Sequence, residues 1–264
     1  MENQPQITDH INQELERVDG WLRANKIKIN VDKTKYMLFS LRKIDYSIRI
    51  KIGAGSIQRA ESTRFLGIYL DEQLNFSHHV NHISKKISKT LGVLNKTRDV
   101  FPPNIRLMLY NSLILPYINY GITSWHCCPA YNRNKIAMLQ RKAIRLIRNL
   151  GPRANTGQHF SALDTLPVDK MFEFQVGQFA FKTVIEGQNS EFYYIVEDNT
   201  IRHRYNSRLI GTLRLPRVDK EKCRNSMEYK FVETWNNIPE QIRNSESTSS
   251  FKANFKRFLL ANLE

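Results

Sequence analysis

The sequence predicts an α+β fold, in which a small N-terminal region of one helix and about four short strands precedes two mainly helical regions. Three observations predict it. Apolar residues recur every three or four positions from Ile7 to Leu22, which is the period of a helix. Apolar and polar residues then alternate in short runs as far as Leu70, and the helical period returns at Phe76.

The N-terminal region is expected to begin with a helix over residues 7–25. Its apolar stripe consists of Ile7, Ile11, Leu15, Val18 and Leu22. Residues 27–31 alternate and predict a turn or a strand, and the apolar run 36–39 predicts a buried strand. Strands are also expected over 48–52 and 65–70, and Gly53-Ala54-Gly55 permits a tight reversal after the first of them.

Six helical segments are expected in the rest of the chain. The first begins near Phe76, and its apolar stripe consists of Val80, Ile83, Ile87, Leu91 and Leu94. The others are expected over 104–115, 133–150, 169–186, 235–242 and 251–260. Pro102-Pro103, Pro116 and Gly151-Pro152 interrupt the pattern, residues 153–158 are expected to be a linker, and residues 187–230 show no clear period.

The composition is that of a globular intracellular protein. Hydrophobic residues make up 41% and charged residues 25% of the 264 residues, unlike a disordered chain. No apolar run approaches the roughly 20 residues of a membrane span, and residues 1–10 carry no signal-peptide core. Three cysteines, two of them adjacent, do not make a disulfide framework. We therefore expect the nucleus or the cytoplasm, with no membrane partner.

The positive charge is concentrated in one segment. The net charge is +15, and residues 83–153 hold 13 Lys and Arg against a single acid, Asp99. Such a concentrated field favours a polyanionic partner, with nucleic acid first and an anionic membrane surface second. The alternative is a solvated basic face kept for solubility, which seldom requires so large an asymmetry.

The sequence contains no clear motif for a catalytic or a metal site. The chain has no phosphate-loop pattern, no nucleophile elbow and no CxxC pair. His78, His79 and His82 lie near a helix start and are expected to be exposed or helix-capping, because nothing nearby completes a metal site. Two-metal phosphoryl chemistry needs paired carboxylates, and the chain has no Asp-Asp pair. Asp71-Glu72 is expected to serve a turn or a helix start.

Five blocks of residues resemble the reverse transcriptases of non-LTR (LINE-type, jockey or CR1-like) retrotransposons. The first lies within residues 11–37 and includes Trp21-Leu22, Ala24-Asn25-Lys26 and Lys33-Thr34-Lys35-Tyr36. The second is Arg64-Phe65-Leu66-Gly67-Ile68-Tyr69-Leu70-Asp71. The third and fourth include Pro116-Tyr117, Asn119-Tyr120-Gly121, Trp125 and Leu139-Gln140-Arg141-Lys142-Ala143. The last comprises Tyr205-Asn206-Ser207-Arg208, Trp235-Asn236-Asn237-Ile238-Pro239 and Ser250-Phe251-Lys252.

The resemblance implies a division of the chain. Residues 1–75 would be the end of the polymerase palm with a primer-grip-like hairpin, residues 76–153 a basic helical thumb, and residues 154–264 a C-terminal region. The family's catalytic aspartates would lie before Met1, so the chain would need an upstream polymerase segment as a partner. No catalytic residue, metal site or cofactor is assigned to this chain, although the complete polymerase would require Mg²⁺.

The resemblance also implies roles for particular residues. A thumb contacts the template–primer duplex through its backbone, and Lys85, Lys86, Lys89, Arg141, Arg145 and Arg148 suit phosphate contacts. Lys33 would lie near the phosphates of the incoming nucleotide, or would be an exposed loop lysine. Arg64, Phe65, Leu66, Gly67 and Ile68 would hold the primer end; alternatively, Gly67 is a strand glycine beside a bulge.

Two functions from different classes remain open at this point. The chain is either a fragment of an RNA-directed DNA polymerase that is inert alone, or a stand-alone basic nucleic-acid-binding module derived from a truncated element. The reading frame upstream of Met1 would separate them. A third hypothesis is that the chain is a helical bundle that binds an acidic protein.

Overall fold

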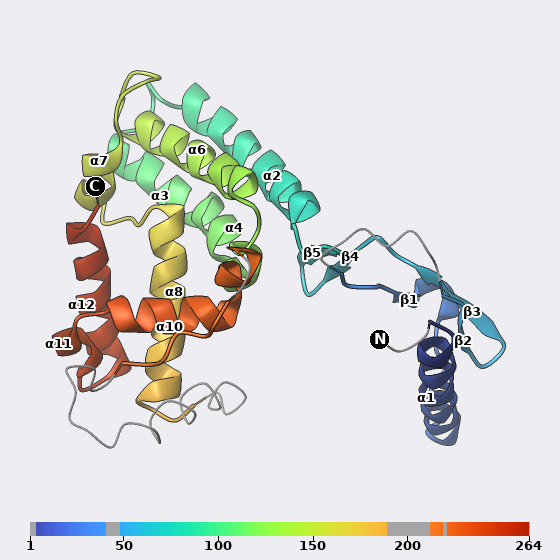
Figure 1. Ribbon diagram of the computed structural model, residues 1–264. Helices are drawn as coiled ribbons and strands as arrows, with labels where there is room; N and C mark the ends of the chain where they lie inside the picture. Colours follow the sequence, from blue (N-terminus) through green and yellow to red (C-terminus); the bar gives the residue numbers. More distant parts are fainter. Residues whose placement is uncertain (1–3, 41–47, 189–211, 219–220, 264) are drawn as a thin grey trace, which may run out of the picture. The chain divides into compact units, whose positions relative to one another are not determined.

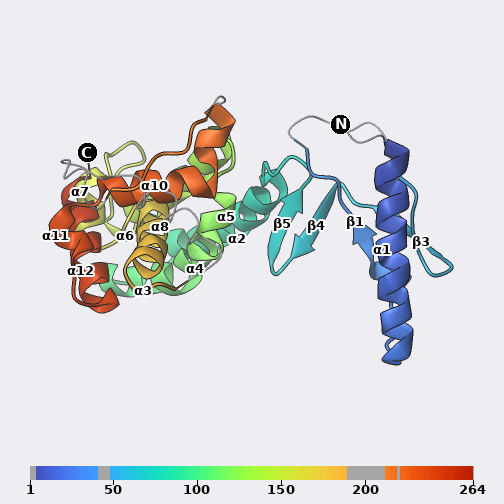
Figure 2. The same ribbon diagram turned by 60° about the horizontal axis from the view of Figure 1, so that its bottom comes forward.

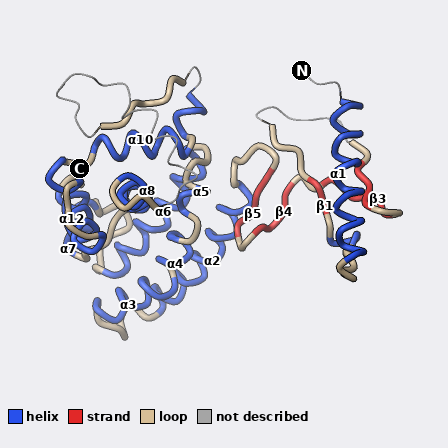
Figure 3. Tube along the Cα trace, turned by 90° about the horizontal axis from the view of Figure 1, so that it is seen from below, coloured by secondary structure: helices blue, strands red, loops and turns tan. Residues whose placement is uncertain are grey.

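The computed structural model describes residues 4–40, 48–188, 212–218 and 221–263 (Figure 1). They form two compact units, Met1–His78 and His79–Glu264. All strands of the described part of the chain lie in the first unit, whereas the second is helical (Figure 3). The α+β fold class is therefore confirmed. The division into segments 1–75, 76–153 and 154–264 stays a prediction.

The first unit is built on a small three-stranded sheet and a separate hairpin. The strands are β1 (Lys35–Tyr36), β2 (Ile50–Ile52), β3 (Gly55–Arg59), β4 (Ser62–Phe65) and β5 (Ile68–Asp71). The sheet has the order β1-β3-β2, in which β3 runs parallel to β1 and antiparallel to β2. The helix α1 (Gln4–Ala24) contacts β2, and Figure 2 shows it beside β1 and β3 of the same sheet.

The core of this unit is small. It consists of Ile50, Ile52 and Ile57, against which Ile11 and Leu15 of α1 pack. A 21-residue helix is about 31 Å long, whereas three strand residues span about 10 Å. The sheet is therefore too short to cover the whole predicted stripe of α1: Ile7 and Val18 are exposed, whereas Ile11, Leu15 and Leu22 are half-buried.

Two strand predictions in this unit were wrong. Of the run 36–39, only Tyr36 is in a strand, and the side chain of Phe39 is 56% exposed. The run 65–70 is not one continuous strand: Phe65 ends β4, residues 68–70 lie in β5, and the two residues between them are the turn of the β4–β5 hairpin. Leu66 and Gly67 form this turn with φ values of 45° and 85°, as the two central residues of a tight hairpin turn require. Gly67 is therefore a turn glycine, not a strand glycine beside a bulge.

The segment between α1 and β1 contains a short 3-10 helix, η1 (Val31–Lys33). The side chain of Asn30 caps it by accepting a hydrogen bond from the backbone N–H of Lys33 at 3.1 Å. Residues 27–30 form no strand and Val31 begins η1, so the strand alternative predicted for residues 27–31 is wrong.

The second unit packs its helices around α8 (Val168–Val184). This helix contacts α5, α6, α10 and α12 (Figure 1). Aromatic pairs make part of the packing, such as Phe181 on Phe251 with ring centroids 4.3 Å apart. The other helices are α2 (Ser77–Lys96), α3 (Pro103–Leu113), α4 (Leu115–Asn119), α5 (Ile122–Trp125), α6 (Ala130–Ile147), α7 (Gly157–Ala162), α10 (Met227–Asn237), α11 (Glu240–Arg243) and α12 (Thr248–Ala261), with the 3-10 helix η3 (Glu221–Asn225).

Three helix boundaries differ from the prediction. Pro116 lies in the first turn of α4, where a missing N–H is tolerated, so it starts a helix rather than only ending one. The predicted helix 235–242 is two helices separated at Pro239, and α10 already begins at Met227 because the Ser226 side chain caps it. The linker predicted over residues 153–158 ends earlier, because α7 already begins at Gly157. Tyr205-Asn206-Ser207-Arg208 lies outside the described residues.

Candidate nucleic-acid interface

The helix α2 separates its apolar and basic residues. The predicted stripe is confirmed, because all five of its members are buried: Val80, Ile83, Ile87, Leu91 and Leu94. The side chains of Lys85, Lys86 and Lys89 are all exposed. Burial of the stripe thus leaves the ammonium groups in solvent, as expected of an amphipathic surface helix.

The helix α6 presents arginines in a similar way. Arg141 and Arg148 are exposed, whereas Arg145 is half-buried. The Arg145 Nε donates a hydrogen bond to the carbonyl oxygen of Ala154 at 2.9 Å. Arg145 therefore also holds the segment that follows α6, in addition to the role predicted for it.

Two hydrogen bonds join α2 to α6. Near the start of both helices, the Lys135 Nζ donates to the Asn81 Oδ1 at 2.6 Å. Beyond their ends, the Arg98 Nε donates to the Asn149 Oδ1 at 3.1 Å. The two helices therefore run in the same direction, side by side (Figure 1).

Two surface depressions lie along these helices, and we call them together the α2–α6 groove. The first, of about 500 Å³, is lined by Asn81, Ser84, Lys85, Ser88, Lys89 and Lys135. The second, of about 710 Å³, is lined by Asn95, Arg98, Met138, Arg141, Lys142, Arg145, Leu146, Leu150, Gly151 and Pro152. Seven of these lining residues are Lys or Arg, and none of the described residues that line either depression is acidic.

A buried arginine supports the end of the groove. Arg106 of α3 is 1% exposed, and its Nη1 donates to the carbonyl oxygen of Leu146 and, at 2.6 Å, to the Asn149 Oδ1. Burial lowers the pKa of Arg106, and the nearby positive charge of Arg98 lowers it further. Asn149 adopts a φ of 55°, so it both turns the chain after α6 and accepts hydrogen bonds from two arginines.

The predicted residues of the first unit lie in two different elements. Lys33 is exposed at the end of η1, which contacts β3. Arg64–Ile68 form the tip of the β4–β5 hairpin, where the side chains of Phe65 and Leu66 are 61% and 74% exposed. The Arg64 guanidinium lies over the Tyr69 ring, 5.9 Å from its centroid. The polymerase roles of these residues stay predictions.

Asp71 and Glu72 have different structural roles. The Asp71 Oδ1 accepts a hydrogen bond from the backbone N–H of Asn75 at 2.8 Å, which confirms the turn role. Glu72 forms an ion pair with Arg59, with oxygen–nitrogen distances of 2.6 and 2.7 Å, which lowers the pKa of the Glu72 carboxyl. This pair links the end of β3 to the residue after β5.

The prediction for the histidines was wrong for His79. Its side chain is only 2% exposed, and neither ring nitrogen has a hydrogen-bond partner among the described residues. The ring lies near Trp125, with centroids 6.2 Å apart. Burial, followed by the charge of His82, lowers the pKa of His79 to about 4. In the described part of the chain, no group of three or more His, Cys, Asp or Glu residues could hold a metal ion.

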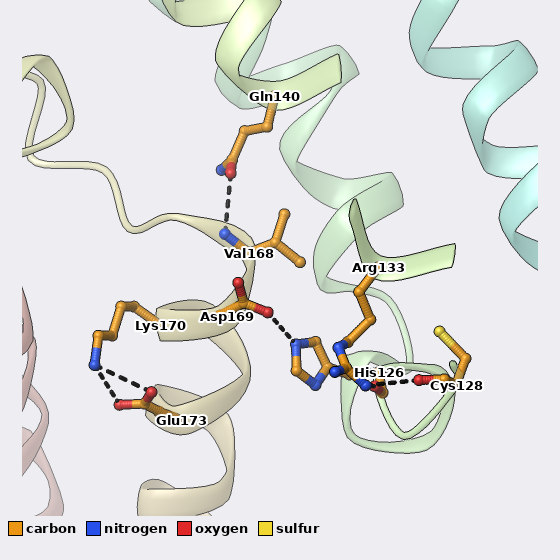
Figure 4. A network of polar contacts seen from close by, with 8 residues as sticks. All are labelled: His126, Cys128, Arg133, Gln140, Val168, Asp169, Lys170 and Glu173. Atoms are coloured by element: carbon orange, nitrogen blue, oxygen red, sulfur yellow. Dashed lines mark hydrogen bonds and ion pairs between the residues drawn. The ribbon is translucent and has the colours of Figure 1, made fainter. Parts of the chain in front are cut away.

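The second unit also contains a polar pocket that the sequence pattern does not predict. The His126 Nε2 lies 2.8 Å from the Asp169 Oδ1 (Figure 4). The His126 ring stacks on Phe172 with centroids 4.1 Å apart. The pocket has a volume of about 410 Å³ and also contains the ion pairs Lys170–Glu173 and Lys230–Glu233. Its residues come from distant segments without a common spacing, so no sequence signal could have found it.

The charges in this pocket are largely compensated. Burial lowers the pKa of His126, and the hydrogen bond to Asp169 partly opposes this. The same hydrogen bond lowers the pKa of Asp169. The Arg133 Nη1 donates to the carbonyl oxygen of Cys128 at 2.6 Å, so it fastens the chain before α6 (Figure 4). In contrast to the α2–α6 groove, this pocket therefore offers a polyanion little net charge.

No helix in the described part of the chain is both long and apolar enough to cross a bilayer. No protein-family model and no solved structure matches the chain.

Comparison with curated proteins finds relatives among mobile-element polymerases. The RNA-directed DNA polymerase from mobile element jockey of Drosophila melanogaster is 24% identical over 144 residues, which is 53% of this chain and 16% of the relative. The probable RNA-directed DNA polymerases from transposon X-element and transposon BS of the same organism are 27% and 23% identical. Each match covers 50% of this chain but only 15% of the relative. This chain is a relative of the RNA-directed DNA polymerases of jockey-like non-LTR retrotransposons.

Proposed function

We propose that this chain is the part of a retrotransposon RNA-directed DNA polymerase that holds the template–primer duplex. The observation that carries the proposal is the segregation of charge. Residues 83–153 contain 13 Lys and Arg against one acid, and all but one of the six predicted contact residues are exposed on α2 and α6. A surface of this kind attracts phosphates, because each contact releases condensed counterions from the duplex.

Recognition is expected to depend on shape and backbone, not on base sequence. Phosphate contacts from Lys and Arg fix the position of a protein on a duplex but carry no sequence information. An RNA–DNA hybrid displays its sequence poorly to side chains, because the deep groove of A-like helices is too narrow to enter. A polymerase must grip any sequence that it copies, so this mode of binding suits the proposed role.

The first unit is proposed to act beside the reaction centre. Lys33, exposed at the end of η1, would meet the phosphates of the incoming nucleotide. The hairpin tip formed by Arg64, Phe65, Leu66, Gly67 and Ile68 would support the primer end. Its exposed Phe65 and Leu66 provide apolar surface for a sugar or base.

No catalytic step is assigned to this chain. It contains no Asp-Asp pair, and its described residues offer no donor set for the metal ions of phosphoryl transfer. The Mg²⁺ of the complete polymerase therefore does not fit the residues present, and synthesis would depend on the upstream segment. Primer extension by the chain alone, on a primed RNA template with dNTPs and Mg²⁺, is expected to equal a no-protein control.

The proposal is tested by binding to an RNA–DNA hybrid. Fluorescence anisotropy would give the affinity of the chain for two hybrids of unrelated sequence over a series of salt concentrations. The affinity should fall steeply with salt and should be similar for the two sequences. A flat salt dependence would refute backbone binding, and a strong preference for one sequence would refute a general grip.

A further inference from the structure

The six predicted contact residues do not all face the same surface. Lys85 and Lys89 line the first depression of the α2–α6 groove, whereas the neighbouring Lys86 is exposed but is not among its lining residues. On α6, Arg141 and Arg145 line the second depression, and the exposed Arg148 does not. Some of the six residues therefore line the groove and others do not, a difference that the sequence pattern alone does not show.

Three further cations join the groove. Lys135 lines the first depression, and Arg98 and Lys142 line the second. The hydrogen bonds of Lys135 to Asn81 and of Arg98 to Asn149 hold these two cations in place through neutral amide oxygens. Because an amide does not neutralise a cation, both charges remain available to an anionic ligand.

We propose that the α2–α6 groove holds a single phosphodiester strand of the duplex, with one depression for each of two phosphate positions. This inference rests on the proposed function and assigns it to one surface, to which Lys86 and Arg148 do not contribute. Arg98, Lys135 and Lys142 become contact residues.

The spacing of the depressions sets how much of the strand is held. Lys135 of the first and Arg145 of the second are ten residues apart in α6, which corresponds to about 15 Å along the helix axis. A strand in duplex DNA rises about 3.4 Å per nucleotide. Because the strand also winds around the duplex axis, this rise sets an upper limit, and the two depressions contact phosphates that are at most about four nucleotides apart.

Three double variants of the full chain test the assignment, and each removes two positive charges. Lys85→Gln with Lys89→Gln alters the first depression, and Arg141→Gln with Lys142→Gln alters the second. Lys86→Gln with Arg148→Gln is the matched control from the same two helices. On a DNA duplex of about twelve base pairs, each groove variant should lower the slope of log affinity against log salt by roughly 0.9, because each depression holds one phosphate, and the control should leave it unchanged.

A shorter probe tests whether there are two phosphate positions. On a dinucleotide, whose single phosphodiester group cannot occupy both depressions at once, combining the two groove variants should lower the slope by less than the sum of their effects on the long duplex. Additive losses on the dinucleotide would overturn the two-position model. A control variant that weakens binding as much as the groove variants would overturn the groove while leaving nucleic-acid binding intact. A wild-type chain that does not bind duplex would refute the proposed function itself.

Discussion

The ammonium group of Lys135 donates a hydrogen bond to the side-chain oxygen of Asn81 at 2.6 Å. This contact joins two residues that are 54 positions apart, and it places the start of α6 beside the start of α2. The basic residues of both helices then line the same groove. The positive charge predicted from composition therefore lies on a definite surface, the α2–α6 groove. The shape of this groove depends on the packing of the second unit.

Gln140 is expected to be a main support of that unit. Its Nε2 donates to the Tyr110 hydroxyl and to the Leu166 carbonyl, both at 2.9 Å, and its Oε1 accepts from the Val168 N–H at 3.0 Å (Figure 4). Gln140→Leu would leave several buried polar groups without partners and should lower the free energy of unfolding by about 3–5 kcal/mol. Urea denaturation measures this change.

The matched control is Gln178→Leu in α8. Gln178 donates to the Phe174 carbonyl of its own helix at 3.2 Å, so its loss should cost less than about 1 kcal/mol. Equal destabilisation by the two variants would show that Gln140 is an ordinary packing residue.

Two helical glycines should respond oppositely to alanine. A Cβ on Gly177 of α8 would overlap the ring of Phe255 of α12, whereas a Cβ on Gly92 of α2 would meet nothing within 4 Å. Gly177→Ala should therefore destabilise the unit by about 1–3 kcal/mol, and Gly92→Ala should stabilise it by about 0.4–1 kcal/mol. Thermal unfolding of both variants gives the comparison. Stabilisation by Gly177→Ala would mean that α8 and α12 are not closely packed there.

Stability should fall between pH 6.5 and pH 4 because of His79. Burial lowers its pKa to about 4, so in this window the unfolded chain takes up a proton that the folded chain does not. The stabilisation is present above pH 6.5 and is lost as the pH falls, by about 3 kcal/mol in all. His79→Leu should flatten the dependence, while the contribution of His126, whose pKa is also lowered, remains. An unchanged pH profile in the variant would contradict the buried neutral histidine.

The two units should differ in protection against hydrogen exchange. The core of the first unit contains three buried isoleucines, and among the described residues β1, β4 and β5 each pair with another strand on one side only. Amides of residues 48–71 should therefore exchange faster than those of α2, α6 and α8, and the isolated chain should aggregate through these strands. Comparable exchange rates in the two sets would show that the first unit is stable without further strands.

The amphipathic helices could be predicted from sequence because their information is local. The spacing of Val80, Ile83, Ile87, Leu91 and Leu94 determines which side of α2 is buried, and therefore which residues reach solvent. The β4–β5 turn could not be predicted in the same way. Leu66 adopts a positive φ that is uncommon for a leucine, and its apolar side chain looks like a strand residue in the sequence.

The groove could be predicted only in part. Helical spacing placed Arg141, Arg145 and Arg148 along one side, but only the packing of α6 beside α2 shows that Arg148 lies outside the lining. Lys135 and Arg98 gave no local signal, because their place depends on Asn81 and Asn149 far along the chain. The pocket around His126 was missed for the same reason.

One salt titration shows whether the basic side of α2 and α6 binds the duplex backbone. The affinity of wild-type chain and of the variant Arg141→Gln, Arg145→Gln, Arg148→Gln would be measured on the same DNA duplex from low to high salt. We expect the slope of log affinity against log salt to drop by roughly 0.9, because Arg141 and Arg145 line the depression that holds one phosphate and Arg148 lies outside it, and to drop equally for unrelated sequences. An unchanged slope and affinity would show that these arginines form only a solvated face, and the duplex-holding function would lose its main support.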